Sequence, residues 1–221
     1  TALYLTRGIK SMIATTEDIG STMPGQDLQE QIRNYIIQEY QAYNVEFVLL
    51  GGDVEHVPYR GFYCYVQSGS GYTDNDIPAD LYYSGLDGTW NDNNDNLWGE
   101  IGEDDLLPDI AVGRYSFSNI QQLNAMKHKT IKYQDEPILG ELAQPLLAGE
   151  FLWADPLTYG SDYINLLVGL QDENGYTTIG IPPTQNIDSL YEKDQSWGGA
   201  DIMAEINKET TVLSLKRRRD M

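Results

Sequence analysis

The sequence predicts an α/β fold in which helices flank a mostly parallel sheet. Two observations support this fold class. Short runs of almost only apolar residues are typical of buried parallel strands, and stretches with helical spacing of apolar residues alternate with these runs. The 221 residues, of which 41% are hydrophobic, are enough to bury a core.

The first half of the chain contains three predicted elements. Residues 11–16 are interpreted as a short strand that ends in a loop. Asp27 is a suitable N-cap for a helix, because the apolar residues after it recur at helical spacing through Tyr43. Residues 45–50 are almost all apolar and end at Gly51-Gly52-Asp53, which predicts a buried parallel strand.

The second half begins with a long polar stretch and then returns to the alternating pattern. Residues 67–108 are rich in Gly, Asn, Asp and Tyr with little periodicity, so we expect a long insert that something must order. Six elements are predicted after it: a strand at 110–114, a helix capped by Ser118 that runs to about Tyr133, a strand at 145–149, a helix that starts at Asp162, a short helix at 199–206 and, last, a strand at 210–215.

The composition excludes several classes of function. Acidic residues number 34 against 14 Lys and Arg, and the resulting net charge of −20 would repel the phosphate backbone of a nucleic acid. No window approaches 18 apolar residues, so no membrane span is expected. The single cysteine, Cys64, excludes an internal disulfide framework, and the two histidines, His56 and His128, limit chemistry based on imidazole.

In a parallel α/β sheet, functional groups gather at the carboxyl ends of the strands. Three such ends stand out in this sequence: Gly51-Gly52-Asp53, Gly113-Arg114 and Ala148-Gly149-Glu150. The sequence has no P-loop, no G-x-G-x-x-G, no H-E-x-x-H and no G-x-S-x-G motif, which argues against a generic α/β hydrolase or a nucleotide-binding domain.

The acidic part of the insert predicts a cation site. Residues 74–109 hold 11 acidic residues and no Lys or Arg, and calcium prefers six to eight oxygen ligands of this kind. Alternate residues of a curled loop point inward, so the expected ligands are Asp87, Asn91, Asn93, Asp95 and Glu100. The opposite parity, with Asp92, Asn94 and Asn96, stays open as an alternative. A solvated acidic loop or an adaptation to salt stays open as well.

Several segments together resemble the gingipain-type cysteine peptidases of peptidase family C25. Residues 47–58 resemble the strand and the G-D-x-x-x-[VI]-P turn of that family. Further segments then follow in the family's order: Asp80-Leu81-Tyr82-Tyr83 before the Asp/Asn-rich loop that ends at Gly99-Glu100, Pro108-Asp109-Ile110-Ala111-Val112-Gly113-Arg114, Leu147-Ala148-Gly149-Glu150, and Asp155-Pro156-Leu157-Thr158-Tyr159-Gly160. The resemblance covers most of residues 8–215.

The resemblance implies a caspase-like three-layer α/β/α sandwich and a secreted cysteine endopeptidase that calcium stabilises. It implies protein or peptide substrates and a place outside the cell or at its surface. In this family a His and a Cys follow successive strands of the sheet and form the catalytic dyad. Asp109 matches an acidic residue that helps to orient the catalytic His, although an ordinary acidic residue at a strand start is the alternative interpretation.

The sequence also departs from the family pattern. The catalytic His is expected just after the strand matched by residues 211–214, where this chain reads Leu215-Lys216-Arg217-Arg218-Arg219-Asp220-Met221. We therefore expect residues 1–215 to be the first part of a catalytic domain that lacks its dyad and is inactive alone, and residues 216–221 to be an atypical basic tail. Cys64 and His56 are not expected to replace the dyad. The alternative function is a non-catalytic, calcium-dependent binding or scaffold module on the same fold.

Overall fold

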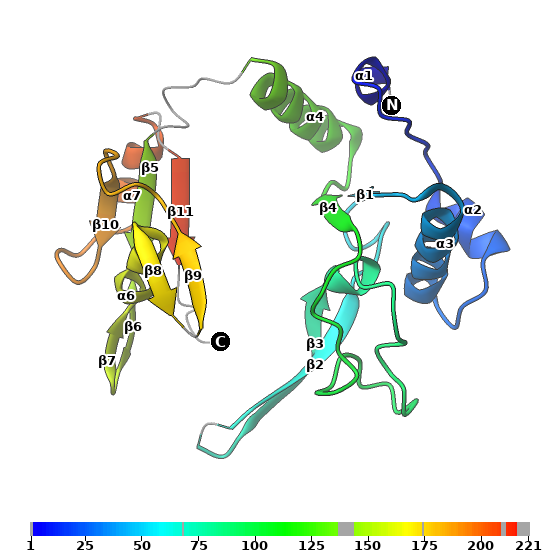
Figure 1. The fold of residues 1–221 in the computed structure, drawn as a ribbon, viewed down its shortest axis with the longest axis horizontal. Coiled ribbons are helices and arrows are strands. Elements are labelled where there is room, and N and C mark those ends of the chain that lie inside the picture. Colours follow the sequence, from blue (N-terminus) through cyan, green and yellow to red (C-terminus); the bar gives the residue numbers. More distant parts are fainter. Residues whose placement is uncertain (1, 68, 137–143, 174, 209–210, 216–221) are drawn as a thin grey trace. The chain divides into compact units, whose positions relative to one another are not determined.

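The computed structural model describes residues 2–67, 69–136, 144–173, 175–208 and 211–215. The chain divides into two compact units, residues 1–128 and residues 129–221, and each is described by itself (Figure 1). The basic tail predicted at residues 216–221 lies outside the described residues.

Three helices open the first unit: α1 (Ala2–Thr6), α2 (Thr16–Thr22) and α3 (Leu28–Tyr43). The predicted cap of α3 is confirmed, because the Asp27 carboxylate accepts a hydrogen bond from the Glu30 amide at 2.9 Å. The helix ends at Asn44, whose left-handed backbone conformation suits an Asn C-cap. The strand predicted at residues 11–16 is wrong, since residues 9–15 form an exposed irregular connection between α1 and α2.

A parallel pair of strands lies beside these helices. β1 (Phe47–Gly51) pairs with β4 (Ala111–Tyr115), with Phe47 opposite Ala111 and Gly51 opposite Tyr115. Val48 and Leu50 face the core, whereas Phe47 and Leu49 are exposed on the other face. The core itself joins α2, α3, β1 and the residues that follow β3, with these buried members: Ile19, Ile32, Ile36, Leu50, Val57, Tyr82, Tyr83, Trp90 and Ile110.

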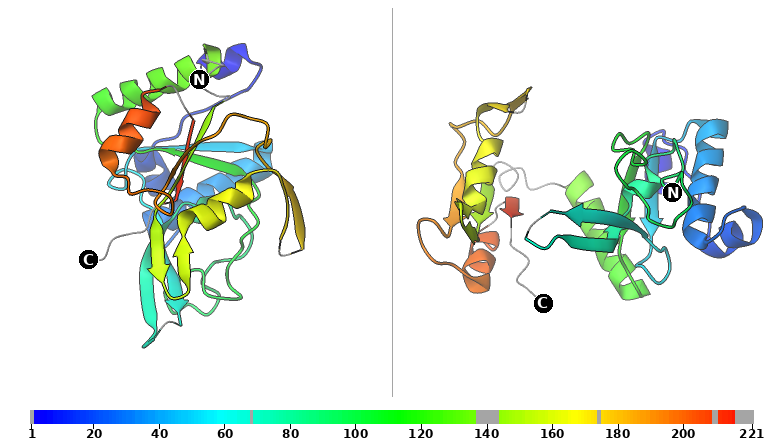
Figure 2. Two further views of the ribbon diagram at one scale, coloured as in Figure 1. Left: turned by 90° about the vertical axis from the view of Figure 1, so that its left-hand side faces the viewer. Right: turned by 90° about the horizontal axis from the view of Figure 1, so that it is seen from below.

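An antiparallel ribbon, which the sequence pattern did not indicate, projects from the first unit (Figure 2). β2 (Arg60–Val66) pairs with β3 (Tyr72–Ala79), and an irregularity between Phe62 and Cys64 shifts the register. The 3-10 helix η1 (Leu81–Tyr83) follows β3. Part of the predicted insert, residues 72–79, is therefore a regular strand, which the mostly polar and exposed residues of β3 disguised.

Helix α4 (Ile120–Asp135) crosses the boundary between the two units. Its cap differs from the predicted one: Asn119, one residue later than Ser118, accepts a hydrogen bond from the Gln122 amide through its side-chain oxygen at 3.0 Å. The helix starts and ends within two residues of the prediction.

The second unit is built on a parallel three-stranded sheet. β5 (Pro145–Gly149) lies between β10 (Asp188–Tyr191) and β11 (Thr211–Leu215), and it is buried along its whole length. This burial on both faces explains why the sequence of β5 is entirely apolar or small. The strands predicted at 145–149 and 210–215 are confirmed, the second within one residue.

Smaller elements surround this sheet. β6 (Phe151–Ala154) and β7 (Leu157–Tyr159) form a short hairpin, and β8 (Leu170–Glu173) and β9 (Tyr176–Ile179) form another. The helix predicted from Asp162 is wrong in extent, because α6 (Gly160–Ile164) stops early and continues only as the 3-10 helix η2 (Asn165–Leu167). Helix α7 (Gly199–Ile206) has the predicted bounds.

The fold is thus a mixed α/β arrangement with parallel strand pairs in each unit, as the sequence predicts. The three-layer sandwich and the status of residues 67–108 as an insert stay predictions. Among the described residues, no helix is both long and apolar enough to cross a membrane.

Candidate functional site

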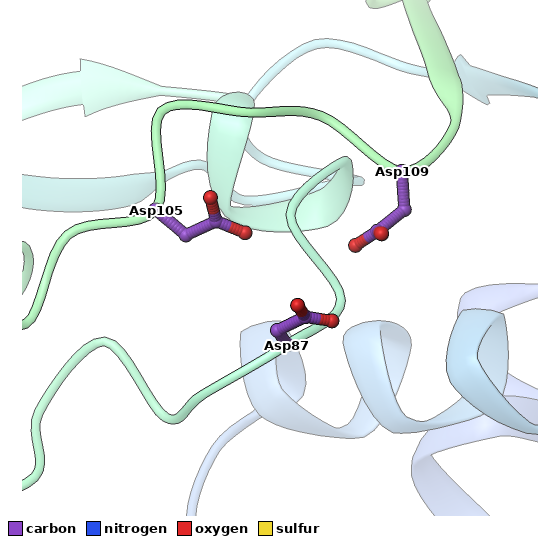
Figure 3. Close-up of side chains that lie close together, drawn as sticks. All are labelled: Asp87, Asp105 and Asp109. Atoms are coloured by element: carbon purple, nitrogen blue, oxygen red, sulfur yellow. The ribbon is translucent and has the colours of Figure 1, made fainter.

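Three carboxylates meet in the segment between η1 and β4 (Figure 3). One side-chain oxygen from each of Asp87, Asp105 and Asp109 lies within 4.8 Å of the other two. Asp105 is half-buried, and the other two are exposed. Carboxylates this close repel each other, and a cation among them would offset that repulsion.

Backbone contacts fix this cluster to the body of the first unit. Asp109 accepts a hydrogen bond from the Leu86 amide at 2.6 Å, and its own amide donates to the Ser84 carbonyl at 2.9 Å. These two bonds join the start of β4 to the turn that carries Asp87. The cluster therefore lies at the amino end of β4, away from the carboxyl end of that strand.

Arg33 of α3 binds the same turn through hydrogen bonds of its side chain. Its buried guanidinium donates to the carbonyls of Gly85, Asp87 and Gly88, at 2.8, 2.8 and 3.2 Å. Burial lowers the pKa of Arg33, although the nearby charges of Asp87 and Asp109 act in the opposite direction. A buried arginine that satisfies three carbonyls keeps the turn in one conformation.

A second group of oxygen ligands lies in the Asp/Asn-rich loop. The Asn93 side-chain amide donates to Asp95 at 3.2 Å and to Glu100 at 3.3 Å, so these three predicted ligands are brought together. Asn91 is buried, and its side-chain oxygen accepts from the amides of Asp95 and Asn96 at 3.1 and 3.3 Å. The side chain of Asn91 therefore curls the loop, which is a role that the sequence pattern did not predict.

Glu103 adds a carboxylate to this second group. One of its oxygens accepts a hydrogen bond from the Asn93 amide at 3.2 Å. Its other oxygen is buried and has no hydrogen-bond partner among the described residues. A buried carboxylate oxygen without a partner is costly, so a cation or water beside it would stabilise the loop.

Arg60 anchors the loop's aromatic residues. Its guanidinium lies 3.8 Å from the centre of the Trp98 ring and 4.6 Å from that of Tyr82, and it forms two hydrogen bonds of 2.8 Å with Asp27. Although burial opposes the shift, the hydrogen bond to Asp27 leaves the pKa of Arg60 raised. Trp90 is 1% exposed and stacks on Phe62, so the loop carries part of the unit's core.

The carboxyl ends of β1 and β4 are joined by Arg114. It forms two hydrogen bonds of 2.7 Å with Asp80 and donates to the carbonyls of Gly52 and Val57 at 3.0 and 2.6 Å. The hydrogen bonds to Asp80 raise the pKa of Arg114. His56 lies in the loop that Arg114 holds, exposed and 4.0 Å from Glu55.

The carboxyl end of the second unit's sheet is rich in acidic side chains. Glu150 follows β5 directly, and Glu192 follows β10 and accepts a hydrogen bond from the Phe151 amide at 2.6 Å. Asp162 in α6 forms an ion pair with Lys193 at 3.0 Å. A hydrogen bond from the Tyr159 amide, together with Lys193, lowers the pKa of Asp162.

The structure thus separates the predicted ligands into two groups. Asp87 lies with Asp109, the predicted orienting residue, whereas Asn93, Asp95 and Glu100 form the second group. The assignment of Asp109 as an orienting residue stays a prediction, because Asp109 and β11 belong to different units. Asp105 and Glu103 were not among the predicted ligands, although the run Glu103-Asp104-Asp105 before Pro108 was a visible signal.

Cys64 and His56 do not form a catalytic pair in the described part of the chain. Cys64 lies in β2, half-buried and opposite Asp74 of β3. The charged neighbour of His56 is Glu55, and no described hydrogen bond joins the imidazole to the thiol. That these two residues do not replace a dyad stays a prediction.

Known proteins are similar to this chain in sequence pattern and in fold. A family model described as "Peptidase family C25" matches residues 2–214. The crystal structure of the Arg-specific cysteine proteinase gingipain R (RgpB) has a TM-score of 0.58 at 20% identity, covering 94% of this chain and 40% of that chain. The complex of Porphyromonas gingivalis RgpB pro- and mature domains has a TM-score of 0.46 at 22% identity, with coverages of 73% and 32%.

The low sequence identity and the partial coverage limit the conclusions from the solved structures. At 20% identity, the likeness to gingipain R concerns the fold alone. The chain spans about two-fifths of the length of that gingipain R chain. A comparison with curated protein sequences found no match.

Proposed function

From the premise that the chain belongs to peptidase family C25, we propose that it is part of a secreted, calcium-stabilised cysteine endopeptidase. Family membership implies a cysteine-type hydrolase that acts on proteins or peptides. In the proposal, a Cys/His dyad contributed by residues beyond this chain hydrolyses the peptide bond. The chain itself supplies the sheet on which that dyad stands.

The chemistry of such a dyad is well defined. The imidazole accepts the thiol proton, and the thiolate attacks the carbonyl carbon of the peptide bond. The imidazolium then gives its proton to the leaving amine, and water hydrolyses the resulting thioester. The chain's own residues contribute by holding the imidazole in a suitable orientation, a task for a nearby carboxylate.

The register between β5 and β11 in the second unit indicates where the catalytic His of the proposed peptidase would lie. Leu215, the last residue of β11, pairs with Gly149 of β5. In the family pattern the catalytic His comes just after this strand, where the present sequence has the basic run 216–219. A His at that place would emerge beside Glu150, the first residue after β5. This pairing is the observation that carries the proposal, because functional groups gather at the carboxyl ends of parallel strands.

Two carboxylates of this chain are thus candidates for orienting the His. Asp109 is favoured by the family resemblance, but it lies at the amino end of β4. Glu150 is favoured by the register of β5 and β11. Glu150→Gln and Asp109→Asn variants of the full-length protein distinguish them, since loss of the orienting carboxylate lowers kcat and shifts the pH profile of the reaction. If neither variant changes the profile, this part of the proposal fails.

Calcium is proposed as a structural ion rather than a catalytic one. Support comes from the two groups of oxygen ligands in the segment between η1 and β4, Asp87, Asp105 and Asp109 in one, and Asn93, Asp95, Glu100 and Glu103 in the other. Carboxylate and carboxamide oxygens are the ligands that calcium prefers. Extracellular modules bind calcium with dissociation constants of about 0.1–1 mM, which suits a protein outside the cell or at its surface.

The second candidate function is a non-catalytic, calcium-dependent binding or scaffold module. One observation favours it: in the part of the chain that the structure describes, no hydrogen bond joins the Cys64 thiol to an imidazole. A peptidase assay of the full-length protein decides between the two candidates. Peptide hydrolysis that thiol alkylation abolishes supports the peptidase, and its absence at saturating calcium supports the binding module.

A further inference from the structure

The β2–β3 ribbon has one edge that is protected against pairing and one that is not. β3 carries Asp74, Asp76 and Pro78, and charges and proline are the means by which proteins discourage pairing at an exposed strand edge. β2 carries no charged residue and no proline after Arg60. The outer edge of β2 therefore carries none of the features that discourage pairing with an additional strand.

A contact within the protein shows which backbone groups face that edge. The Tyr63 amide donates to the Trp98 carbonyl at 2.8 Å, so it points away from β3. Peptide groups two residues apart in a strand point to the same side, so the N–H and C=O of Tyr65 also face outward. Trp98 occupies the first position along this edge, and the next position is that of Tyr65.

The side chains around this position are apolar or aromatic and reach solvent. Tyr65 is 51% exposed and Val66 is 49% exposed, and Tyr72, opposite Val66, is 63% exposed. The ribbon extends away from the rest of its unit (Figure 2). An added strand would lie next to these side chains and gain contact with them.

The acidic charge of the protein determines which kind of partner strand this edge would bind. Between residues 61 and 79 the charged residues are Asp74 and Asp76, both acidic, and the whole chain has a net charge of −20. A second copy of the ribbon would bring these like charges toward each other, which is unfavourable. A basic strand is attracted instead, and a Lys or Arg beside Tyr65 can contact the face of its ring.

We propose that the outer edge of β2 at Tyr65 binds an extended, basic segment of a partner protein by strand addition. In that segment Lys or Arg alternates with apolar residues. The backbone of the segment pairs with the N–H and C=O of Tyr65, continuing the edge that Trp98 begins. This interaction is independent of the proposed peptide hydrolysis.

The test uses the 221-residue chain and a fluorescein-labelled peptide, Gly-Lys-Val-Lys-Val-Lys-Gly, as the probe. Tyr65→Pro removes an outward amide of β2, and Thr73→Pro is the matched control because Thr73 pairs with Tyr65 and its amide faces the other edge. We expect Tyr65→Pro to weaken binding at least about tenfold, and Thr73→Pro to change it by less than about twofold. Replacing every Lys of the probe by Glu should abolish binding.

Three outcomes would overturn the proposal. One is an equal effect of the two proline variants while circular dichroism shows that both remain folded. Another is the absence of binding at a probe concentration of about 1 mM, which corresponds to an affinity too weak to matter. The third is self-association of the chain in sedimentation that Tyr65→Pro abolishes, because a second copy would then be the occupant.

Discussion

The carboxylates of Asp87 and Asp109 lie within 4.8 Å of each other, although 22 positions separate the two residues in the sequence. The hydrogen bond from the Leu86 amide to Asp109 holds them together, and Arg33 fixes the turn that carries Asp87. Their proximity links the acidic loop to the start of β4. A cation at this point would tie the loop to the sheet.

The first prediction concerns the two proposed calcium groups. We expect calcium to raise the melting temperature of the protein, and Asp105→Asn to reduce this rise because Asp105 belongs to the first group. Glu100→Gln should reduce it through the second group. Differential scanning calorimetry with and without 5 mM calcium, about five times the highest dissociation constants of extracellular modules, measures the effect.

Asp104→Asn is the matched control for this experiment. It removes the same charge one residue away, and Asp104 is exposed and bonded to the Gly102 amide rather than to either group. An equal loss of the calcium effect in Asp104→Asn would mean that net charge, not a built site, attracts the ion. No shift by calcium in the unaltered chain would refute both groups.

The second prediction concerns the buried Arg60. Arg60→Met should destabilise the protein by about 3–5 kcal/mol, because it leaves the Asp27 carboxylate without its cationic partner and removes the guanidinium that lies over Tyr82 and Trp98. Lys193→Met is the comparison, since its ion pair with Asp162 is exposed and should contribute far less stability. Urea denaturation of the two variants measures the difference, and similar losses would contradict the anchoring role of Arg60.

The third prediction concerns pH. The hydrogen bonds from Arg60 and the Glu30 amide outweigh burial and lower the pKa of Asp27 from its ordinary value of 3.8. A lowered pKa in the folded state contributes stability that is present above the ordinary value and is lost as the pH falls through the folded value. We therefore expect the free energy of unfolding to fall below about pH 4.

Asp27→Asn isolates this contribution. The variant is less stable at pH 7, and its stability should decrease less between pH 4 and pH 2 than that of the unaltered protein. Urea denaturation at three pH values provides the comparison. Parallel pH curves for the two proteins would show that Asp27 does not contribute to acid sensitivity.

The fourth prediction concerns the close packing at Gly85. A Cβ atom at this position would lie 2.7 Å from the Trp90 ring, so Gly85→Ala should cost about 1–3 kcal/mol of stability. Gly113→Ala in β4 is the control, because a Cβ there meets nothing within 4 Å. Thermal denaturation of both variants measures the effect, and equal melting temperatures would mean that Trp90 can move aside.

The parts of the fold that the sequence predicted are those with strong local signals. The cap and spacing of α3 and the apolar runs of β1, β4 and β5 carry enough information by themselves. The β2–β3 ribbon was missed because both of its strands are polar or aromatic rather than alternating. The helix from Asp162 was overextended, because its leucines fit helical spacing but η2 ends at Leu167.

The sequence predicted which types of residue form the candidate site, but it did not predict which of these residues lie close together. The count of Asp and Asn residues indicated a cation site, but no local pattern shows that Asp87 lies with Asp109 rather than with Asn93. That grouping depends on Arg33, which is 54 residues away from Asp87 and holds its carbonyl. The position of Glu150 beside the end of β11 is likewise a product of strand register, which the sequence does not display.

The most direct measurement is hydrolysis of fluorogenic peptides by the 221-residue chain and by the full-length protein, each in calcium. We expect turnover by the full-length protein that thiol alkylation abolishes, and no turnover by the 221-residue chain. Turnover by the 221-residue chain that Cys64→Ala abolishes would contradict this expectation, because the nucleophile would then be Cys64 of β2.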